Sequence, residues 1–392
     1  MATLTRMFGD LDAAADAVQE ACALAVAKWP VTGVPANPRA WLTGTARHKA
    51  LDRMRREAGR AEKEAAAMRE FGDRQDPGSR AYDDTAPDDE LALIFMCCHP
   101  AFDPAVRVAL TLRCVCGLST AEIAAALLAP EPTVAQRVVR AKRKIRQAGI
   151  SFGVPAGDDL AGRLAVVLRV IYLVFTAGHL AAHGDRLIRG ELCDQAIRLA
   201  RGLTTLLPAE PEAAGLLALL LLTDARRAAR LDDAGELVLL ADQDRTRWDR
   251  AMISEGEELL ERALRAGKPG PYQLHAAIAA CHSCDETTDW REVAALYGEL
   301  IRYEPTPVVA ANRAVAVAMA EGPAAGLVIL DTISDSLASW PQLHIARAEL
   351  LRRLGREGDA REAYQAALRL GPPAPEREFL QRRLGELTEP GR

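Results

Sequence analysis

Aromatic residues are scarce in this chain, making up 5% of its 392 residues. Runs of β-branched residues are also short, and this combination disfavours sheet-rich folds because strands depend on both kinds of side chain. Apolar residues, many of them alanine, recur instead at helical spacing. The sequence therefore predicts an all-α protein of about two or three domains.

Long hydrophobic stretches are missing as well. The longest fully apolar run covers residues 213–222, far less than a membrane span requires. The chain also does not open with a basic segment, an apolar core and small residues, the pattern of a secretory signal. We therefore expect a soluble protein without membrane segments that acts in the cytoplasm.

The eight cysteines form no regular framework, which predicts reduced thiols in a reducing compartment. Cys97, Cys98, Cys114 and Cys116 raise the alternative of a metal site or thiol sensor. However, Cys97 and Cys98 fall on different faces of a helix, and no Cys-x-x-Cys pair occurs among these four. Buried thiols are the favoured interpretation, with no metal or cofactor.

Residues 106–150 carry the clearest functional pattern, that of a DNA-binding helix-turn-helix. An apolar helix over 106–116 ends at Gly117. Ser119 and Glu122 then form a capping box at the start of a short helix. Two prolines within 129–132 force a turn before a third helix.

The third helix of this segment has two distinct faces. Its predicted inward face consists of Val134, Val138, Ala141 and Ile145. Its predicted major-groove face consists of Thr133, Gln136, Arg137, Arg140 and Lys144. Gln and Arg form bidentate hydrogen bonds to base edges, and the segment 106–150 holds eight Lys/Arg against two Asp/Glu. The alternative is a solvated basic helix on an ordinary helical hairpin.

A second basic surface is predicted upstream. Residues 11–28 form an amphipathic helix that ends before Trp29, and another helix begins near Arg39. The predicted core residues of the second helix are Trp41, Leu42, Thr45 and Leu51, and its basic residues are Arg47, Lys49, Arg53, Arg55, Arg56 and Arg60. An indole beside guanidinium groups suits single-stranded nucleic acid. The alternative is a core tryptophan on a solvated helix.

Together these segments resemble the sigma factors of the extracytoplasmic-function type. Region 2 of that family is similar to three stretches of this chain: DAVQEA at 16–21, Trp41-Leu42 and the basic run 46–56. Region 4 of the family is similar to the helix-turn-helix. The resemblance implies that region 2 docks on the β′ clamp helices of core RNA polymerase and opens and reads the -10 element of promoter DNA. It further implies that region 4 reads the -35 element and binds the β flap.

The resemblance assigns roles to individual residues. The implied polymerase contacts are Asp16, Gln19 and Glu20. The implied contacts with the -10 element are Trp41, Arg47, His48, Arg53 and Arg56. The implied contacts with the -35 element are the groove-facing residues of the third helix. His48 stands where the family usually has asparagine. Only ten residues precede Leu11, so region 2 is trimmed or the true start lies upstream.

The remainder of the chain predicts an acidic linker and a helical extension. Residues 70–90 hold eight acidic residues, which predicts a flexible tether. Residues 341–372 follow the 34-residue tetratricopeptide pattern, with weaker copies at 312–330 and 290–305, and such helix pairs stack into a solenoid. Region 2, region 4 and this extension together resemble the ECF42 group, in which the extension governs activity.

The predicted domains are region 2 over 1–62, the linker over 63–88, region 4 over 89–152 and the tetratricopeptide-like domain over 153–392. That last domain offers a surface for a peptide, protein or small-molecule ligand.

Two further functional classes remain open. One is a DNA-binding regulator with a sensor domain that never replaces sigma. The other is a metal-dependent enzyme, for which paired carboxylates at 242–249, the set His275, Cys281, His282 and Cys284, and the pair His179 and His183 are the candidates. Helix caps and helix-end polar residues are the favoured interpretations of these patterns, so we expect no enzymatic activity.

Overall fold

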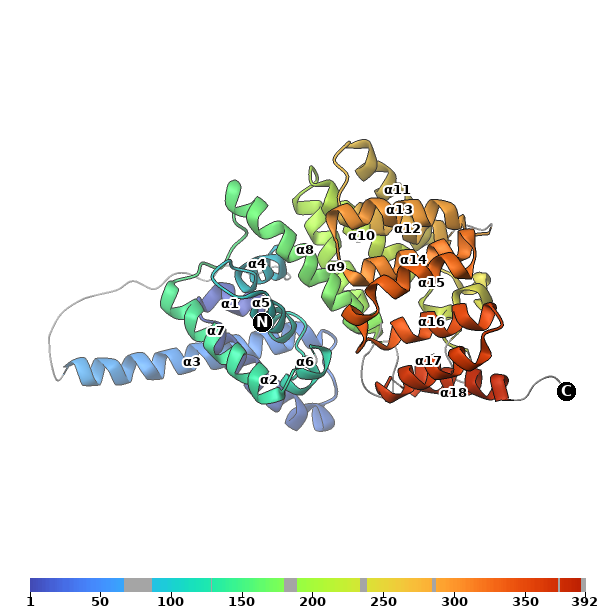
Figure 1. The fold of residues 1–392 in the computed structure, drawn as a ribbon. Coiled ribbons are helices and arrows are strands. Elements are labelled where there is room, and N and C mark those ends of the chain that lie inside the picture. Colours follow the sequence, from blue (N-terminus) through green and yellow to red (C-terminus); the bar gives the residue numbers. More distant parts are fainter. Residues whose placement is uncertain are drawn as a thin grey trace. The chain divides into compact units, whose positions relative to one another are not determined.

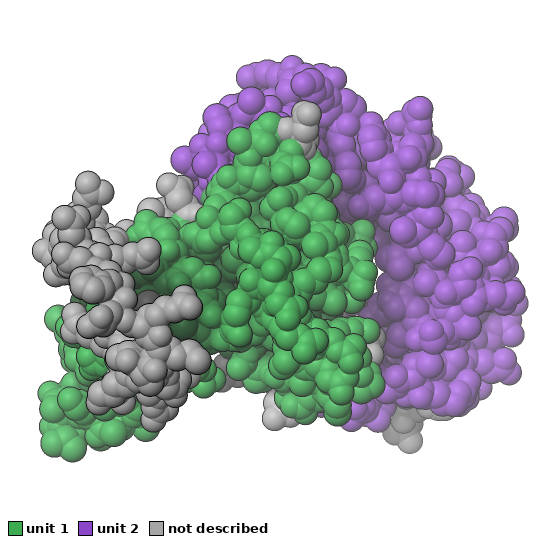
Figure 2. All heavy atoms as spheres, turned by 90° about the vertical axis from the view of Figure 1, so that its left-hand side faces the viewer, with its two compact units in different colours: residues 1–170 green, residues 171–392 purple. Residues whose placement is uncertain are grey.

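The computed structural model describes residues 1–66, 87–127, 129–179, 189–232, 238–283, 287–372 and 374–388. These residues form helices, without β-strands (Figure 1). The chain divides into two compact units, residues 1–170 and 171–392 (Figure 2). The all-α prediction is therefore confirmed. The predicted linker lies mostly outside the described residues.

The first unit begins with seven helices: α1 (Ala2–Phe8), α2 (Leu11–Thr32), α3 (Pro38–Ala66), α4 (Pro87–Cys97), α5 (Pro104–Cys114), α6 (Thr120–Ala126) and α7 (Glu131–Ala148). Helix α8 (Asp158–His179) contains the boundary between the units. The segments predicted as regions 2 and 4 therefore lie in one compact unit, which ends at Val170. Side-chain placement is not described for residues 53–66.

Helices α2 and α3 pack through small side chains. Ala14, Ala17 and Ala21 of α2 are buried against Ala46 and Ala50 of α3. Because alanine has only a methyl group, the two helix backbones come close together. The predicted core face of α3 is therefore shifted, since its alanines are fully buried while Trp41, Leu42, Thr45 and Leu51 are half-buried.

Helix α2 continues four residues past its predicted end at Lys28. Pro30 lies inside its last turn, and the helix ends at Gly33, whose φ is 81°. The amide of Gly33 still donates to the carbonyl of Trp29 at 2.9 Å. Proline has no amide hydrogen to donate, and the helix nevertheless continues through Pro30.

Helix α4 is buried from Leu91 onward; its last residue is Cys97, and Cys98 follows directly after it. Cys97 and Cys98 are 0% exposed, and Cys114 on α5 is 2% exposed. Burial raises the pKa of the Cys98 thiol to about 12, against the opposing hydrogen bond from Thr111. The predicted burial of these three thiols is confirmed, and Cys98 stays protonated and unreactive at neutral pH.

The second unit is built from successive helices. After α8 come α9 (Gly190–Leu206), α10 (Pro211–Asp224), α11 (Arg250–Arg265), α12 (Pro271–Ser283), α13 (Trp290–Tyr303), α14 (Pro307–Glu321), α15 (Pro323–Ile333), α16 (Pro341–Arg353), α17 (Glu357–Arg369) and α18 (Ala374–Thr388). Short 3-10 helices are η1 (Arg227–Ala229), η2 (Leu240–Asp242), η3 (Arg245–Arg247) and η4 (Asp335–Leu337). From α10 onward each α-helix packs against the next along the chain (Figure 1).

The segment with the tetratricopeptide pattern forms the helix pair α16 and α17. Its pattern positions Ala348, Leu351, Ala360, Tyr364 and Ala367 are buried in one core. Gly355 occupies the turn between the helices with a φ of 72°, a conformation that glycine adopts without strain. The small and bulky residues of this pattern thus pack the two helices together, as the sequence indicates.

One helix among the described residues is long and apolar enough to cross a membrane. It is the stretch Gly162–His179 of α8, whose mean hydropathy is 1.3. Core helices of soluble proteins pass the same test, and 44% of this stretch is buried within the protein. The run singled out from the sequence, residues 213–222, belongs to α10, where Leu216, Leu220 and Leu222 are fully buried.

Candidate polymerase and nucleic-acid interface

Helices α5, α6 and α7 form the predicted helix-turn-helix. After α5 the chain reverses at Gly117, whose φ of 71° favours glycine. The amide of Ser119 donates to Oε2 of Glu122 at 2.7 Å, and the amide of Glu122 donates to Oγ of Ser119 at 3.2 Å. These reciprocal bonds are the predicted capping box, and they start α6.

Helix α7 carries one apolar and one polar face, as predicted. Val134, Val138, Ala141 and Ile145 are all buried. On the predicted groove face, Gln136 and Arg140 are exposed, and Thr133 and Arg137 are half-buried. An α-helix fits the major groove of B-DNA, where Gln and Arg side chains reach base edges. Gln136 and Arg140 therefore lie on the exposed part of the face for which base contacts are predicted.

Lys144 differs from the other residues of this face. Its Nζ donates to the carbonyl of Ala101 at 2.6 Å and lies 5.7 Å from the centre of the Phe102 ring. The side chain therefore braces the loop before α5. The ammonium group has two further hydrogens, so a phosphate contact by Lys144 is compatible with the bond to Ala101.

The C-terminal half of α7 also pairs with α2, a contact that sequence reasoning missed. Nζ of Lys142 lies 3.1 Å from Oδ1 of Asp12, and Arg146 lies 3.1 Å from Asp10 and 2.5 Å from Asp12. Asp12 and Arg146 are 134 positions apart, so no local pattern predicts their meeting. Within the first unit, these ion pairs join the segments that resemble regions 2 and 4.

The start of α4 pairs with the N-terminal helices in the same way. Arg6 lies 3.3 Å from the carboxylate of Asp89, which is 3% exposed, and Arg39 lies 3.7 Å from Glu90. A buried carboxylate needs a charged partner, and Arg6 supplies it. Helix α1 also packs directly against α4. These contacts explain why the two predicted domains form one unit.

The predicted polymerase contacts lie on the outer face of α2. Asp16, Gln19 and Glu20 are exposed, whereas Ala14, Ala17 and Ala21 point into the core. Asp10 caps the helix by accepting from the amides of Asp12 and Ala13 at 2.7 and 3.2 Å. The cap and the alanine stripe orient α2, so that Asp16, Gln19 and Glu20 lie on its exposed face.

The residues predicted at the -10 element lie on α3. Trp41 is half-buried and packs edge-to-face on Trp29, with ring centroids 5.5 Å apart. Arg47 is half-buried, and the exposed His48 ring places Nδ1 2.9 Å from the carbonyl of Gly44. Arg53 and Arg56 belong to α3, but their side chains lie outside the description. The sequence did not indicate Trp29 as the partner of Trp41.

The charged segment 242–249 consists of helix caps. Oδ1 of Asp244 accepts from the amide of Thr246 at 2.9 Å, and Oδ1 of Asp249 accepts from the amides of Ala251 and Met252 at 3.0 Å. The prediction of caps here is confirmed for these two aspartates. Their oxygens stabilise the starts of η3 and α11.

The predicted metal candidates on α12 have other partners. Nε2 of His275 lies 3.1 Å from Oε2 of Glu304. The ring of His282 packs against Trp290, with centroids 5.3 Å apart. Cys284 lies outside the described residues, as does His183. His179, in contrast, comes close to Cys193 and Asp224, residues that the sequence did not connect with it.

Comparisons with known proteins identify three segments of the chain. Residues 1–60 match sigma-70 region 2, residues 92–145 match sigma-70 region 4, and residues 163–264 match DUF6596, a family of unknown function. An uncharacterized protein of Rhizobium meliloti (strain 1021), R00370, is 44% identical over 397 aligned positions, which cover 99% of this chain and 93% of that protein. No solved structure matches the chain.

Proposed function

We propose that this chain, which belongs to the sigma-70 family, is a sigma factor of the extracytoplasmic-function type that resembles the ECF42 group. The presence of region 2 and region 4 domains in one chain carries the proposal. Region 2 and region 4 domains imply that the chain recognises promoters together with RNA polymerase. A protein with this role acts in the cytoplasm and needs no catalytic residues of its own.

Region 2 binds core polymerase through the outer face of α2. The exposed Asp16, Gln19 and Glu20 are the proposed contacts with the β′ clamp helices. Two carboxylates and an amide on one rigid helix face suit a basic partner surface and give it a defined register. The alanine side of the same helix holds this face in place.

Promoter DNA is read at two places. The pair Trp29 and Trp41 presents an aromatic cluster beside Arg47 and His48 of α3, which suits unstacked bases of the -10 element. Arg53 and Arg56 continue the same basic helix. The polar face of α7 reads the -35 element through Gln136, Arg137 and Arg140, with Thr133 at its start.

The helical extension modulates this activity in our proposal. Its support is the acidic character of residues 151–392, which hold 28 Lys/Arg and 35 Asp/Glu, and its large share of the chain. An acidic domain is a poor DNA ligand and a suitable competitor for basic surfaces. The same domain is the proposed receptor for a peptide, a protein or a small-molecule ligand.

Run-off transcription with purified core polymerase on genomic fragments tests the main proposal. We expect promoter-dependent transcripts that disappear when the protein is left out. DNA binding without transcripts would instead indicate a regulator that does not replace sigma. A truncated chain ending at Gly157 separates these outcomes, because transcripts restored by truncation would identify an inhibited sigma factor.

Substitutions on α2 test the polymerase contact. Asp16→Ala with Glu20→Ala is expected to abolish binding to core polymerase, since it removes both carboxylates from the outer face. Asp159→Ala is the matched control, because its side chain is 77% exposed and lies outside α2. Equal polymerase binding by wild type and the double variant would contradict the proposed interface.

A further inference from the structure

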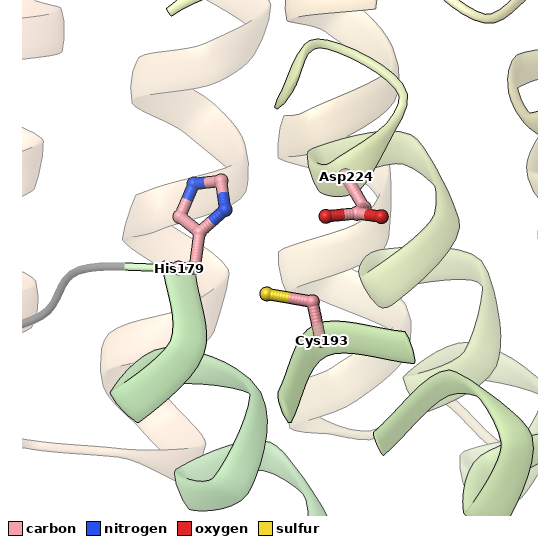
Figure 3. Close-up of side chains that lie close together, drawn as sticks. All are labelled: His179, Cys193 and Asp224. Carbon is pink, nitrogen blue, oxygen red and sulfur yellow. The ribbon is translucent and has the colours of Figure 1, made fainter. Parts of the chain in front are cut away.

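Three helices of the second unit bring together a histidine, a cysteine and an aspartate. His179 ends α8, Cys193 lies in the first half of α9 and Asp224 ends α10. One ligand atom of each residue lies within 4.8 Å of the others, and Figure 3 shows the three side chains converging. Cys193 is 0% and Asp224 5% exposed, so the cluster is largely shielded from water.

Two glycines allow this convergence. A Cβ at Gly178 would lie 2.8 Å from the carbonyl oxygen of Arg189 and 2.9 Å from the amide of Cys193. A Cβ at Gly190 would lie 2.8 Å from Nη1 of Arg227. The end of α8 therefore approaches the start of α9 closely, and the amide of Arg189 donates to the carbonyl of Gly178 at 2.7 Å.

The backbone carbonyl of His179 accepts a hydrogen bond, whereas its ring nitrogen Nδ1 has no hydrogen-bond partner among the described residues. A guanidinium nitrogen of Arg230 donates to the carbonyl of His179, and the ring stacks on Phe175 with centroids 5.2 Å apart. Nδ1 of His179 is buried, and no described residue offers it a hydrogen bond. A buried ring nitrogen without a hydrogen-bond partner is unfavourable, and a bound cation supplies the missing partner.

The aspartate is already oriented. Arg227 donates from Nε to Oδ1 of Asp224 at 2.8 Å and from Nη2 to Oδ2 at 2.5 Å. The same guanidinium lies 2.7 Å from the more exposed Asp194. Each carboxylate oxygen keeps a further lone pair, and a hydrogen-bonded carboxylate is the usual partner of a metal ion. Arg227 thus positions Asp224 without using up its acceptor capacity.

Charge balance selects the kind of ion. A thiolate and a carboxylate supply two negative charges, which match a divalent cation, while the imidazole binds as a neutral ligand. Arg226, Arg227 and Arg230 add positive charge around the cluster, and Asp194 offsets part of it. The two anionic ligands therefore counter the surrounding arginines and favour a divalent ion at this site.

We infer that His179, Cys193 and Asp224 bind one Zn²⁺ ion. Nitrogen, sulfur and oxygen ligands on three helices are a set that zinc accepts, with a fourth position for water or a further ligand. Tetrahedral bond lengths require the ligand atoms to be roughly 3.5 Å apart, so atoms that now lie within 4.8 Å of one another need to close in by at most about 1.3 Å on binding. The thiol proton passes to solvent as the zinc–sulfur bond forms. The ion thereby ties α8, α9 and α10 together.

Metal loading of the full-length protein tests this inference. Chelator-treated protein is incubated with Zn²⁺ or with Co²⁺, desalted and analysed for metal content. We expect one equivalent of metal, and a thiolate-to-cobalt charge-transfer band in the cobalt form. Cys193→Ser is expected to lose that band and to bind zinc at least about 10-fold more weakly, as is Asp224→Asn.

Cys281→Ser is the matched control, because Cys281 is a half-buried thiol on α12, outside the cluster. It should keep both the metal and the band. No retained metal in wild type, or metal lost equally from Cys281→Ser, would overturn the inference. If Cys193→Ser fails to fold, as circular dichroism would show, the spectrum of cobalt-loaded wild type decides, since a missing charge-transfer band excludes a cysteine ligand.

Discussion

Gly178 shows how one missing methyl group decides local packing. A Cβ there would meet Leu192 Cβ at 2.8 Å as well as backbone atoms of α9, which cannot rotate away. We expect Gly178→Ala to lower the free energy of unfolding by about 1–3 kcal/mol, because the two helices must separate. Chemical denaturation followed by circular dichroism measures the loss.

Gly162 on the same helix supplies the control. It is exposed, and a Cβ at this position meets no atom within 4 Å. Gly162→Ala should raise stability by about 0.5–1 kcal/mol, because alanine loses less backbone entropy in a helix than glycine. If both substitutions changed stability alike, helix propensity alone would explain them, and the close contact at Gly178 would not matter.

At the scale of the element, the start of α6 depends on the capping box. Ser119→Ala removes the hydroxyl that accepts from the amide of Glu122, and we expect a loss of about 0.5–2 kcal/mol in unfolding free energy. Thermal denaturation of the full chain measures it. Ser151→Ala, at an exposed position after α7, is the control and should change little.

A double-mutant cycle with Glu122→Ala tests whether the two bonds act together. Ser119 donates its amide to Glu122 and accepts in return, so the second substitution should cost less once the first is present. Strictly additive effects would show that the bonds are independent.

On α7, Arg140 is expected to read a base. Arg140→Ala should weaken binding to the preferred promoter by about 1–3 kcal/mol and relax specificity at one position. Arg143→Ala, also exposed on α7, should weaken all sequences alike if that cation contacts phosphate. Binding to a library of -35 variants distinguishes the two. A uniform loss for Arg140→Ala would place this residue on the DNA backbone instead.

At the scale of the whole first unit, stability should depend on the charge of Asp10. Burial by itself would raise the pKa of Asp10, but the amides of Ala13 and Asp12 together with Arg146 hold this pKa below its usual value. The charged form is therefore favoured in the folded protein. The contribution of the charged Asp10 to the free energy of unfolding is fully present above the pKa of the unfolded state, which is about 4. It disappears as the pH falls through the lower pKa of the folded state.

Asp10→Asn tests this dependence, since the amide keeps a cap acceptor but loses the charge that pairs with Arg146. We expect the variant to be less stable by about 1 kcal/mol or less at pH 7, because the side chain is partly exposed and screened. Below about pH 4 the difference should shrink, and it should vanish once the pH is below the lowered pKa of the folded state. Denaturation curves between pH 3 and 7 measure it, and a difference that grew on acidification would contradict the sign.

The local features of this protein follow from its sequence. The cap at Ser119, the reversal at Gly117 and the two faces of α7 are confirmed because each depends on residues within about two helical turns. The same holds for the caps at Asp244 and Asp249. The end of α2 was predicted too early, because Pro30 was taken as a stop although the helix continues past it to Thr32.

Contacts between distant segments were decided only by the tertiary structure. The sequence paired neither Lys142 nor Arg146 with another segment, and the fold brings Asp10 and Asp12 beside them. Likewise, His179, Cys193 and Asp224 have no shared spacing, and they meet because Gly178 lets α8 approach α9 closely while α10 packs against α9. Periodicity reports which face of a helix is buried, but it carries no information about which other helix covers that face.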